Sequence, residues 1–116
     1  MTLLHQTASP HPGGYRDIDP ARVVAAGEQV RIVDVREPAE YTGELGHAPG
    51  AELVPLGTLE QAARSWDRAQ EIVVVCRSGA RSGRAAALLA SMGFRHVMNL
   101  TGGMLAWSAA KLPVEH

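Results

Sequence analysis

The sequence has very little cysteine and few aromatic residues. Cys76 is the only thiol in 116 residues, so an internal disulfide is excluded and the fold does not depend on oxidation. A single thiol fits a reducing compartment. Aromatic residues make up 4% of the chain, which leaves Leu, Val, Ala and Met to fill most of the core.

The chain also lacks net charge and long apolar runs. The formal net charge of −1 at neutral pH gives no overall attraction to nucleic acid or to an anionic membrane. No segment reaches the ~20 apolar residues that span a bilayer, and the N-terminal MTLLHQTASPHPGGY has neither the basic start nor the apolar run of a signal peptide. We therefore expect one cytoplasmic domain with no nucleic-acid or membrane partner.

What the sequence does contain is an alternation of strand and helix patterns. Asp19 followed by Pro20 predicts the start of a helix, and Gly27 its end. The continuous apolar run 71–75 is typical of a central parallel strand covered on both faces. The other patterns predict strands at 30–35, 52–54 and 96–100 and helices within 36–44, 56–66, 82–92 and 102–111. This alternation indicates an α/β domain, in which ligands bind beyond the carboxyl ends of the strands.

The segment VVVCRSGARSGRAAALL (73–89) places Cys76 at such a strand end, just before a helix. Gly79 can adopt the positive φ of a sharp turn, and the N–H groups of such a turn form an anion-binding site. These groups, with Arg77 and Arg81, favour the nucleophilic thiolate. A lone cysteine is more often a small buried apolar residue, but this setting favours a reactive one. Arg84 lies further along the helix, where a solvated arginine is expected.

The loop CRSGARS (76–82), between an apolar strand and a helix of small residues, resembles the active-site loop of rhodanese-type sulfurtransferases. VDVREPAEY (33–41), GHAPGA (46–51) and GGMLAW (102–107) resemble further segments of that family in the same order, with Ala48 where the family usually has a larger apolar residue. The resemblance implies a three-layer rhodanese-like α/β domain at 17–116, whose central, mainly parallel sheet is flanked by helices. Residues 1–16 would be a flexible N-terminal lead-in.

The resemblance also implies sulfur transfer. The Cys76 thiolate would take the outer sulfur of thiosulfate or a related persulfide, hold it as a persulfide, and pass it to cyanide or a thiol. The expected partners are thus a small anionic donor and a thiol or cyanide acceptor, a protein acceptor stays open, and no cofactor is expected. The substrate-binding loop would comprise Arg77, Ser78, Gly79, Ala80, Arg81 and Ser82, with Arg77 and Arg81 attracting the donor.

Three more residues are candidates for supporting roles. Family resemblance implies that Asp34 and Arg36 brace the neighbouring loops, and a simple structural pair is the alternative. His47 would either act near the site or cap its own loop. The five histidines show no HExxH or HxH spacing and the chain has one cysteine, so no metal site is expected.

Two other functions stay open. The first is a cysteine phosphatase or arsenate reductase, whose pattern CxxxxxR forms a longer loop around a tetrahedral oxyanion. In this chain Arg81 follows Cys76 after only four residues, and the next residue is Ser82. The shorter loop should suit a single sulfur atom better. A non-catalytic rhodanese-like module that binds a partner is the third hypothesis, and the presence of Cys76 weighs against it.

Overall fold

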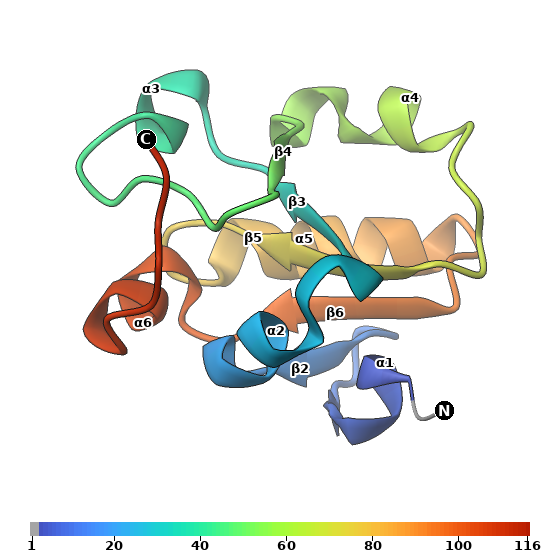
Figure 1. The fold of residues 1–116 in the computed structure, drawn as a ribbon. Coiled ribbons are helices and arrows are strands. Elements are labelled where there is room, and N and C mark those ends of the chain that lie inside the picture. The colour runs from blue at the N-terminus through green and yellow to red at the C-terminus, as the bar shows by residue number, and fades with distance from the viewer. Residues whose placement is uncertain (1–2) are drawn as a thin grey trace.

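The computed structural model describes residues 3–116, which form one six-stranded sheet with helices on both faces (Figure 1). The strand order is β1-β2-β6-β5-β3-β4, and only the β1–β2 pair is antiparallel among these neighbours. The strands are β1 (Ser9–Pro10), β2 (Arg16–Ile18), β3 (Arg31–Asp34), β4 (Glu52–Leu53), β5 (Glu71–Val75) and β6 (His96–Leu100). This architecture confirms the predicted α/β class with a mainly parallel sheet.

The helices follow the predicted alternation. Asp19 caps α2 by accepting a hydrogen bond from the Arg22 N–H at 3.2 Å, and Gly27 follows the helix with φ 58°. The α-helices are α1 (Leu4–Thr7), α2 (Pro20–Ala26), α3 (Pro38–Tyr41), α4 (Leu59–Ala63), α5 (Ala80–Ser91) and α6 (Gly103–Ala109); η1 (Gly27–Gln29) and η2 (Leu56–Thr58) are 3-10 turns. None of the helices within residues 3–116 has the length and apolar character needed to cross a membrane.

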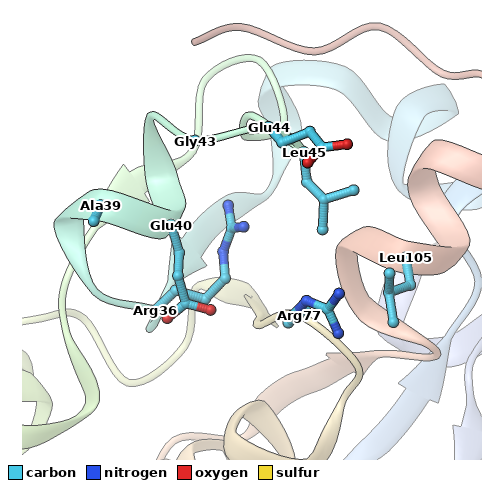
Figure 2. A pocket seen from close by; sticks show the side chains of 8 residues that line it. All are labelled: Arg36, Ala39, Glu40, Gly43, Glu44, Leu45, Arg77 and Leu105. Carbon is cyan, nitrogen blue, oxygen red and sulfur yellow. The ribbon is translucent and has the colours of Figure 1, made fainter.

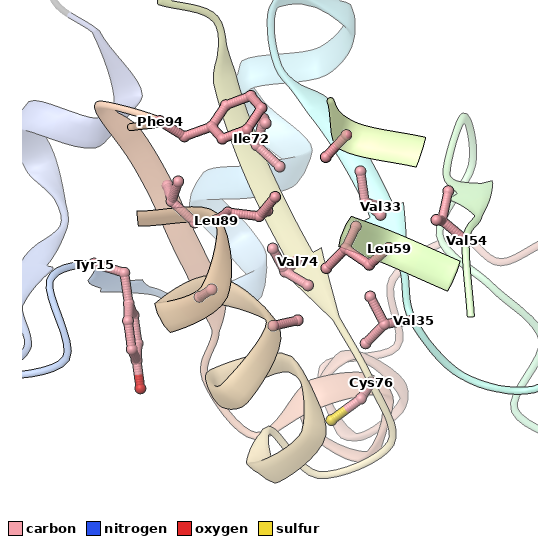
Figure 3. Packing of buried hydrophobic residues seen from close by; sticks show 14 residues of the cluster. Tyr15, Val33, Val35, Val54, Leu59, Ile72, Val74, Cys76, Leu89 and Phe94 are labelled. Carbon is pink, nitrogen blue, oxygen red and sulfur yellow. The ribbon is translucent and has the colours of Figure 1, made fainter. Parts of the chain in front are cut away.

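Strand β5 shows why the sheet is covered on both faces. Its side chains alternate, so that Ile72 and Val74 point into one core cluster and Val73 and Val75 into the other. The first cluster packs under α4 and α5, with Cys76 at its edge (Figure 3). The second packs under α2 and α6, where Trp107 is buried. The apolar run of β5 therefore stabilises both layers of helices, as its composition predicted.

The N-terminal residues, for which sequence analysis expected a flexible lead-in, contain short regular elements. Residues 4–16 contain α1, β1 and the first residue of β2, and Ala8 and Tyr15 are buried. Strand β2 extends the sheet because it pairs in parallel with β6, with Asp17 opposite Asn99. Elements α1, β1 and β2 are too short to produce a periodic sequence pattern, and β2 pairs with β6, a strand from the far end of the chain. The domain boundary at residue 17 stays a prediction.

Candidate active site

The candidate site lies at the carboxyl edge of the sheet, where Cys76 directly follows β5. The thiol is 1% exposed. The chain turns at Gly79, which has φ 106° and is the N-cap of α5. The segments that follow β3 and β6 begin at the same edge, because both strands are parallel neighbours of β5. The predicted strand–loop–helix arrangement around Cys76 is thus present.

Backbone N–H groups and one hydroxyl group contact the Cys76 sulfur. Sγ accepts a hydrogen bond from the Gly79 N–H at 3.0 Å, and the Ser82 hydroxyl lies 3.3 Å away. Burial raises the pKa of the Cys76 thiol, but the Ser82 hydroxyl and the N–H groups of Ser82, Gly79 and Ser78 outweigh it, so the pKa lies below its ordinary value. The loop therefore favours the thiolate, which is the nucleophilic form of cysteine.

The Ser82 hydroxyl has a second neighbour that sequence analysis missed. It lies 2.5 Å from the side-chain carbonyl oxygen of Asn99 in β6, whose amide nitrogen donates to the carbonyl of Gly79 at 3.2 Å. Asn99 is 8% exposed. One signal could have revealed it, because an amide in the strand HVMNL must find partners when the strand is buried.

The two loop arginines lie in different surroundings. Arg81 donates to both carboxylate oxygens of Glu40 in α3, at 2.8 and 2.7 Å. These hydrogen bonds lower the pKa of Glu40 from 4.5 to about 2. Arg77 is exposed and takes part in none of the ion pairs found within residues 3–116. Of the two guanidinium groups, that of Arg77 is therefore the more accessible to an anion.

A pocket of about 370 Å³ adjoins the cysteine loop, and Arg77 lines it. Figure 2 shows Arg77 and Leu105 of α6 on one side of this pocket and Leu45 on the other. Arg36 and Glu40 also line it. The pocket thus combines the accessible Arg77 guanidinium with apolar surface and with the carboxylates of Glu40 and Glu44, next to the cysteine loop.

Asp34 and Arg36 form the pair expected from their spacing. Both are buried, and the Arg36 guanidinium donates to the Asp34 carboxylate at 2.8–3.2 Å. Arg36 also donates to the carbonyl of Gly46 at 2.6 Å, so the pair ties the end of β3 to the loop 46–51. A buried charge pair of this kind requires such additional hydrogen bonds to offset desolvation.

His47 lies in a different environment from the cysteine loop. Its Nδ1 is 2.8 Å from the carbonyl of Tyr41, its ring stacks on that of Tyr41, and its backbone pairs with that of Glu115. These contacts agree with a histidine that holds its own loop in place. Its supporting role at the site stays a prediction.

Helix α6 packs its N-terminus directly against the cysteine loop. The N–H groups of Met104 and Leu105 donate to the carbonyls of Cys76 and Arg77 at 2.9 and 3.0 Å. Gly103 makes this approach possible, since a Cβ there would lie 2.5 Å from both carbonyl oxygens. The sequence predicts a turn at Gly102 and Gly103. In the structure Gly103 also allows the backbone of α6 to approach the backbone of the cysteine loop closely.

The residues at the site limit the chemistry that it can perform. Within residues 3–116 no group of three or more His, Cys, Asp or Glu side chains is placed to hold a metal ion. The loop supplies one nucleophile, hydrogen-bond donors aimed at its sulfur, and an exposed cation beside it. This set is suited to covalent transfer of a group carried by a small anion.

Comparison with known proteins adds a family. Residues 20–110 match the model of the rhodanese-like domain. A Bacillus subtilis protein described as a putative sulfur carrier protein, YrkF, is 40% identical over 85 residues, which are 73% of this chain and 45% of that protein. A sulfurtransferase of Allochromatium vinosum is 37% identical over 91 residues, 78% of this chain and 83% of that protein. The chain thus spans less than half of the first relative and most of the second.

Two further matches cover nearly all of the similar protein. The thiosulfate sulfurtransferase GlpE of Vibrio cholerae is 31% identical over 99 residues, 85% of this chain and 92% of GlpE. The crystal structure of a rhodanese-related protein from Thermoplasma volcanium superimposes with a TM-score of 0.77 at 26% identity, over 85% of this chain and 96% of that one. Sequence and fold therefore lead to the same group of proteins.

Proposed function

The chain belongs to the rhodanese-like domain family, and we propose that it transfers a sulfane sulfur from thiosulfate or a persulfide to a thiol or cyanide through a Cys76 persulfide. The observation that carries this proposal is the environment of Sγ. It is buried, it accepts the Gly79 N–H at 3.0 Å, and its pKa is lowered. A cysteine that only filled the core would not need these donors.

The proposed first half-reaction uses the thiolate as nucleophile. Sγ of Cys76 attacks the outer sulfur of thiosulfate, an S–S bond forms, and the S–S bond of thiosulfate breaks, so that sulfite leaves with the electron pair. Cys76 then carries a persulfide whose terminal sulfur bears the negative charge. The N–H groups of the loop stabilise this anion as they stabilise the thiolate.

The second half-reaction restores the thiolate. Cyanide or an acceptor thiolate attacks the terminal sulfur and takes it, and the electron pair of the breaking S–S bond returns to Sγ. Neither half-reaction requires a metal or a cofactor. In this proposal Arg77 attracts the anionic donor, because it is exposed and lines the pocket next to the loop.

Mass spectrometry tests the proposal directly. Wild-type protein incubated with thiosulfate should gain the mass of one sulfur atom on the peptide that contains Cys76, and cyanide or dithiothreitol should remove it. Cys76→Ser is the control, because a serine hydroxyl is not ionised at neutral pH. It should neither gain sulfur nor transfer it to cyanide while remaining folded. An unmodified Cys76 peptide after incubation with thiosulfate and with persulfide donors would leave the non-catalytic module as the better reading.

A further inference from the structure

Asn99 is a polar side chain in the buried part of strand β6. It is 8% exposed, and its neighbours Met98 and Leu100 in β6 are fully buried. A buried amide costs free energy unless both of its ends are hydrogen-bonded. Asn99 meets this requirement with two residues of the cysteine loop, Gly79 and Ser82, which are also the residues that donate to the Cys76 sulfur.

The carbonyl of Gly79 fixes which end of the amide faces Ser82. That carbonyl can only accept, so the NH₂ group of Asn99 must point toward it, and the Asn99 carbonyl oxygen is left facing the Ser82 hydroxyl. The opposite orientation would place two acceptors against each other. The contact between Asn99 and Ser82, at 2.5 Å, therefore needs the hydroxyl proton.

That hydroxyl has one proton and two acceptors within reach. The Asn99 oxygen lies at 2.5 Å and the Cys76 sulfur at 3.3 Å. A neutral sulfur is a weak acceptor, so an uncharged thiol leaves the proton with Asn99. A thiolate is a strong acceptor and draws the proton to itself. The Asn99 oxygen then faces a hydroxyl oxygen without a proton between them, which is unfavourable.

We propose that Asn99 is a positioning residue whose carbonyl competes with the Cys76 sulfur for the Ser82 hydroxyl proton. It holds the proton when Sγ is uncharged and opposes its transfer when Sγ ionises. In the sulfur-transfer cycle, where this rests on the proposed function, Sγ of the persulfide is also uncharged. Asn99 then satisfies the buried hydroxyl in that state and favours the persulfide over the free thiolate.

The other ionisable groups near the loop are unchanged by substitutions at Asn99 and Ser82. Four of these groups form two ion pairs, Asp34 with Arg36 and Glu40 with Arg81, and hydrogen bonds join each pair. Arg77 lies on the pocket side of the loop. The ionisable groups on the opposite side, around Asn99, are His11, Tyr15, Asp17 and Arg84. All of these groups are retained in the Asn99 and Ser82 variants. A difference in the Cys76 ionisation midpoint between the variants therefore reports the hydrogen bond of the Ser82 hydroxyl.

The test is the pH dependence of Cys76 alkylation by iodoacetamide, which needs no sulfur transfer and so is independent of the proposed function. Ser82→Ala should raise the midpoint, because the thiolate loses a donor. Asn99→Ala should lower it by about half a pH unit, because the competing acceptor is gone. Asn99→Ala in the Ser82→Ala background should leave the midpoint where Ser82→Ala put it.

Two controls keep this result interpretable. Ser91→Ala removes an exposed hydroxyl from the same helix and should leave the midpoint unchanged. If Asn99→Ala does not fold, as judged by circular dichroism, Asn99→Val removes the same acceptor with a side chain suited to a strand. A residue that only supported the fold would raise the midpoint by loosening the loop. A raised or unchanged midpoint, or a decrease that persists without the Ser82 hydroxyl, overturns the proposal.

Discussion

Arg81 of α5 and Glu40 of α3 are joined by two parallel hydrogen bonds of 2.8 and 2.7 Å. The two residues are 41 positions apart in the chain, so this pair connects the first turn of α5 to a separate short helix. Sequence analysis expected Arg81 to attract the sulfur donor. Because both of its terminal nitrogens already contact Glu40, an anion would have to compete with a carboxylate for them.

The pair should make stability depend on pH in the acid range. The pKa of Glu40 falls from 4.5 to about 2 on folding, so its carboxylate stabilises the fold above about pH 4.5, and this contribution is lost as the pH falls toward 2. Glu40→Gln should reduce the free energy of unfolding by about 0.5–1 kcal/mol at pH 7, since the pair is partly exposed. The difference from wild type should shrink by pH 3 in urea titrations.

Glu60→Gln is the matched control for that measurement. Glu60 pairs with Arg64 across one helical turn at 3.4 Å, and both side chains are more than half exposed. Its substitution should change the free energy of unfolding little at either pH. A Glu40→Gln deficit that is equally large at pH 7 and pH 3 would contradict the role given to the Arg81 pair.

Arg77 should contribute most to donor capture. Arg77→Ala should raise the KM for thiosulfate and lower kcat/KM, with a loss of transition-state stabilisation of about 1–3 kcal/mol, the range for hydrogen bonds to charged groups. Arg84→Ala is the control, since Arg84 is also exposed but lies further along α5. Higher ionic strength should weaken donor capture by the wild type, because an exposed anion site is screened. Steady-state rates at low and moderate salt measure both effects, and equal losses in the two variants would count against Arg77.

A comparison with Glu40→Ala separates the two possible roles of Arg81. If Arg81 only anchors the loop, Arg81→Ala and Glu40→Ala should alter kcat/KM to a similar degree, and the double variant should add little. If it also binds the donor, as sequence analysis expected, Arg81→Ala should raise the KM well beyond the effect of Glu40→Ala.

The local parts of the fold were predictable from local patterns. Strands β5 and β6 begin and end at the predicted residues, 71–75 and 96–100, and Asp19 with Pro20 marked the start of α2. The N-terminal segment was missed because β2 has three residues and owes its place in the sheet to β6. The sequence of residues 16–18 alone does not predict their pairing with β6.

The contacts at the site were also predictable only where the residues are close together in the sequence. Cys76, Gly79 and Ser82 lie close together in the sequence, between the end of β5 and the first turn of α5. Their mutual placement therefore follows from a strand that runs into a helix. Glu40 and Asn99 reach the loop only through tertiary packing, across 41 and 17 residues from their partners. Glu40 lies in the segment 33–41 that resembles the family, and Asn99 lies in a predicted strand. Neither pattern identifies the partner of the side chain, because these contacts form only when the folded chain brings the segments together.

The short cysteine loop should give little phosphatase activity. Four residues separate Cys76 from Arg81, and the Arg81 guanidinium is directed to Glu40 rather than held free for a tetrahedral oxyanion. Hydrolysis of p-nitrophenyl phosphate should therefore be negligible. One residue inserted between Gly79 and Arg81 should improve phosphate binding and reduce sulfur transfer. Efficient hydrolysis by the unaltered protein would reverse this ranking of the two chemistries.

Gly103 should be essential to the shape of the cysteine loop. Its φ is 57°, and a Cβ would lie 2.5 Å from the carbonyl oxygens of both Cys76 and Arg77. Gly103→Ala must therefore push α6 away from the loop and break the hydrogen bonds that Met104 and Leu105 donate to it. The strained backbone alone costs about 1–2 kcal/mol, and displacement of the nucleophile should lower sulfur transfer by about tenfold or more.

Gly50→Ala separates the contact from the backbone strain. Gly50 also has a positive φ, 82°, but a Cβ there would meet no atom within 4 Å. It should lose stability in urea unfolding while transferring sulfur at close to the wild-type rate. Gly103→Ala should lose both, with slower alkylation of Cys76 as an independent readout of the displaced loop. Wild-type transfer and alkylation rates in folded Gly103→Ala would show that the close approach of α6 does not shape the site.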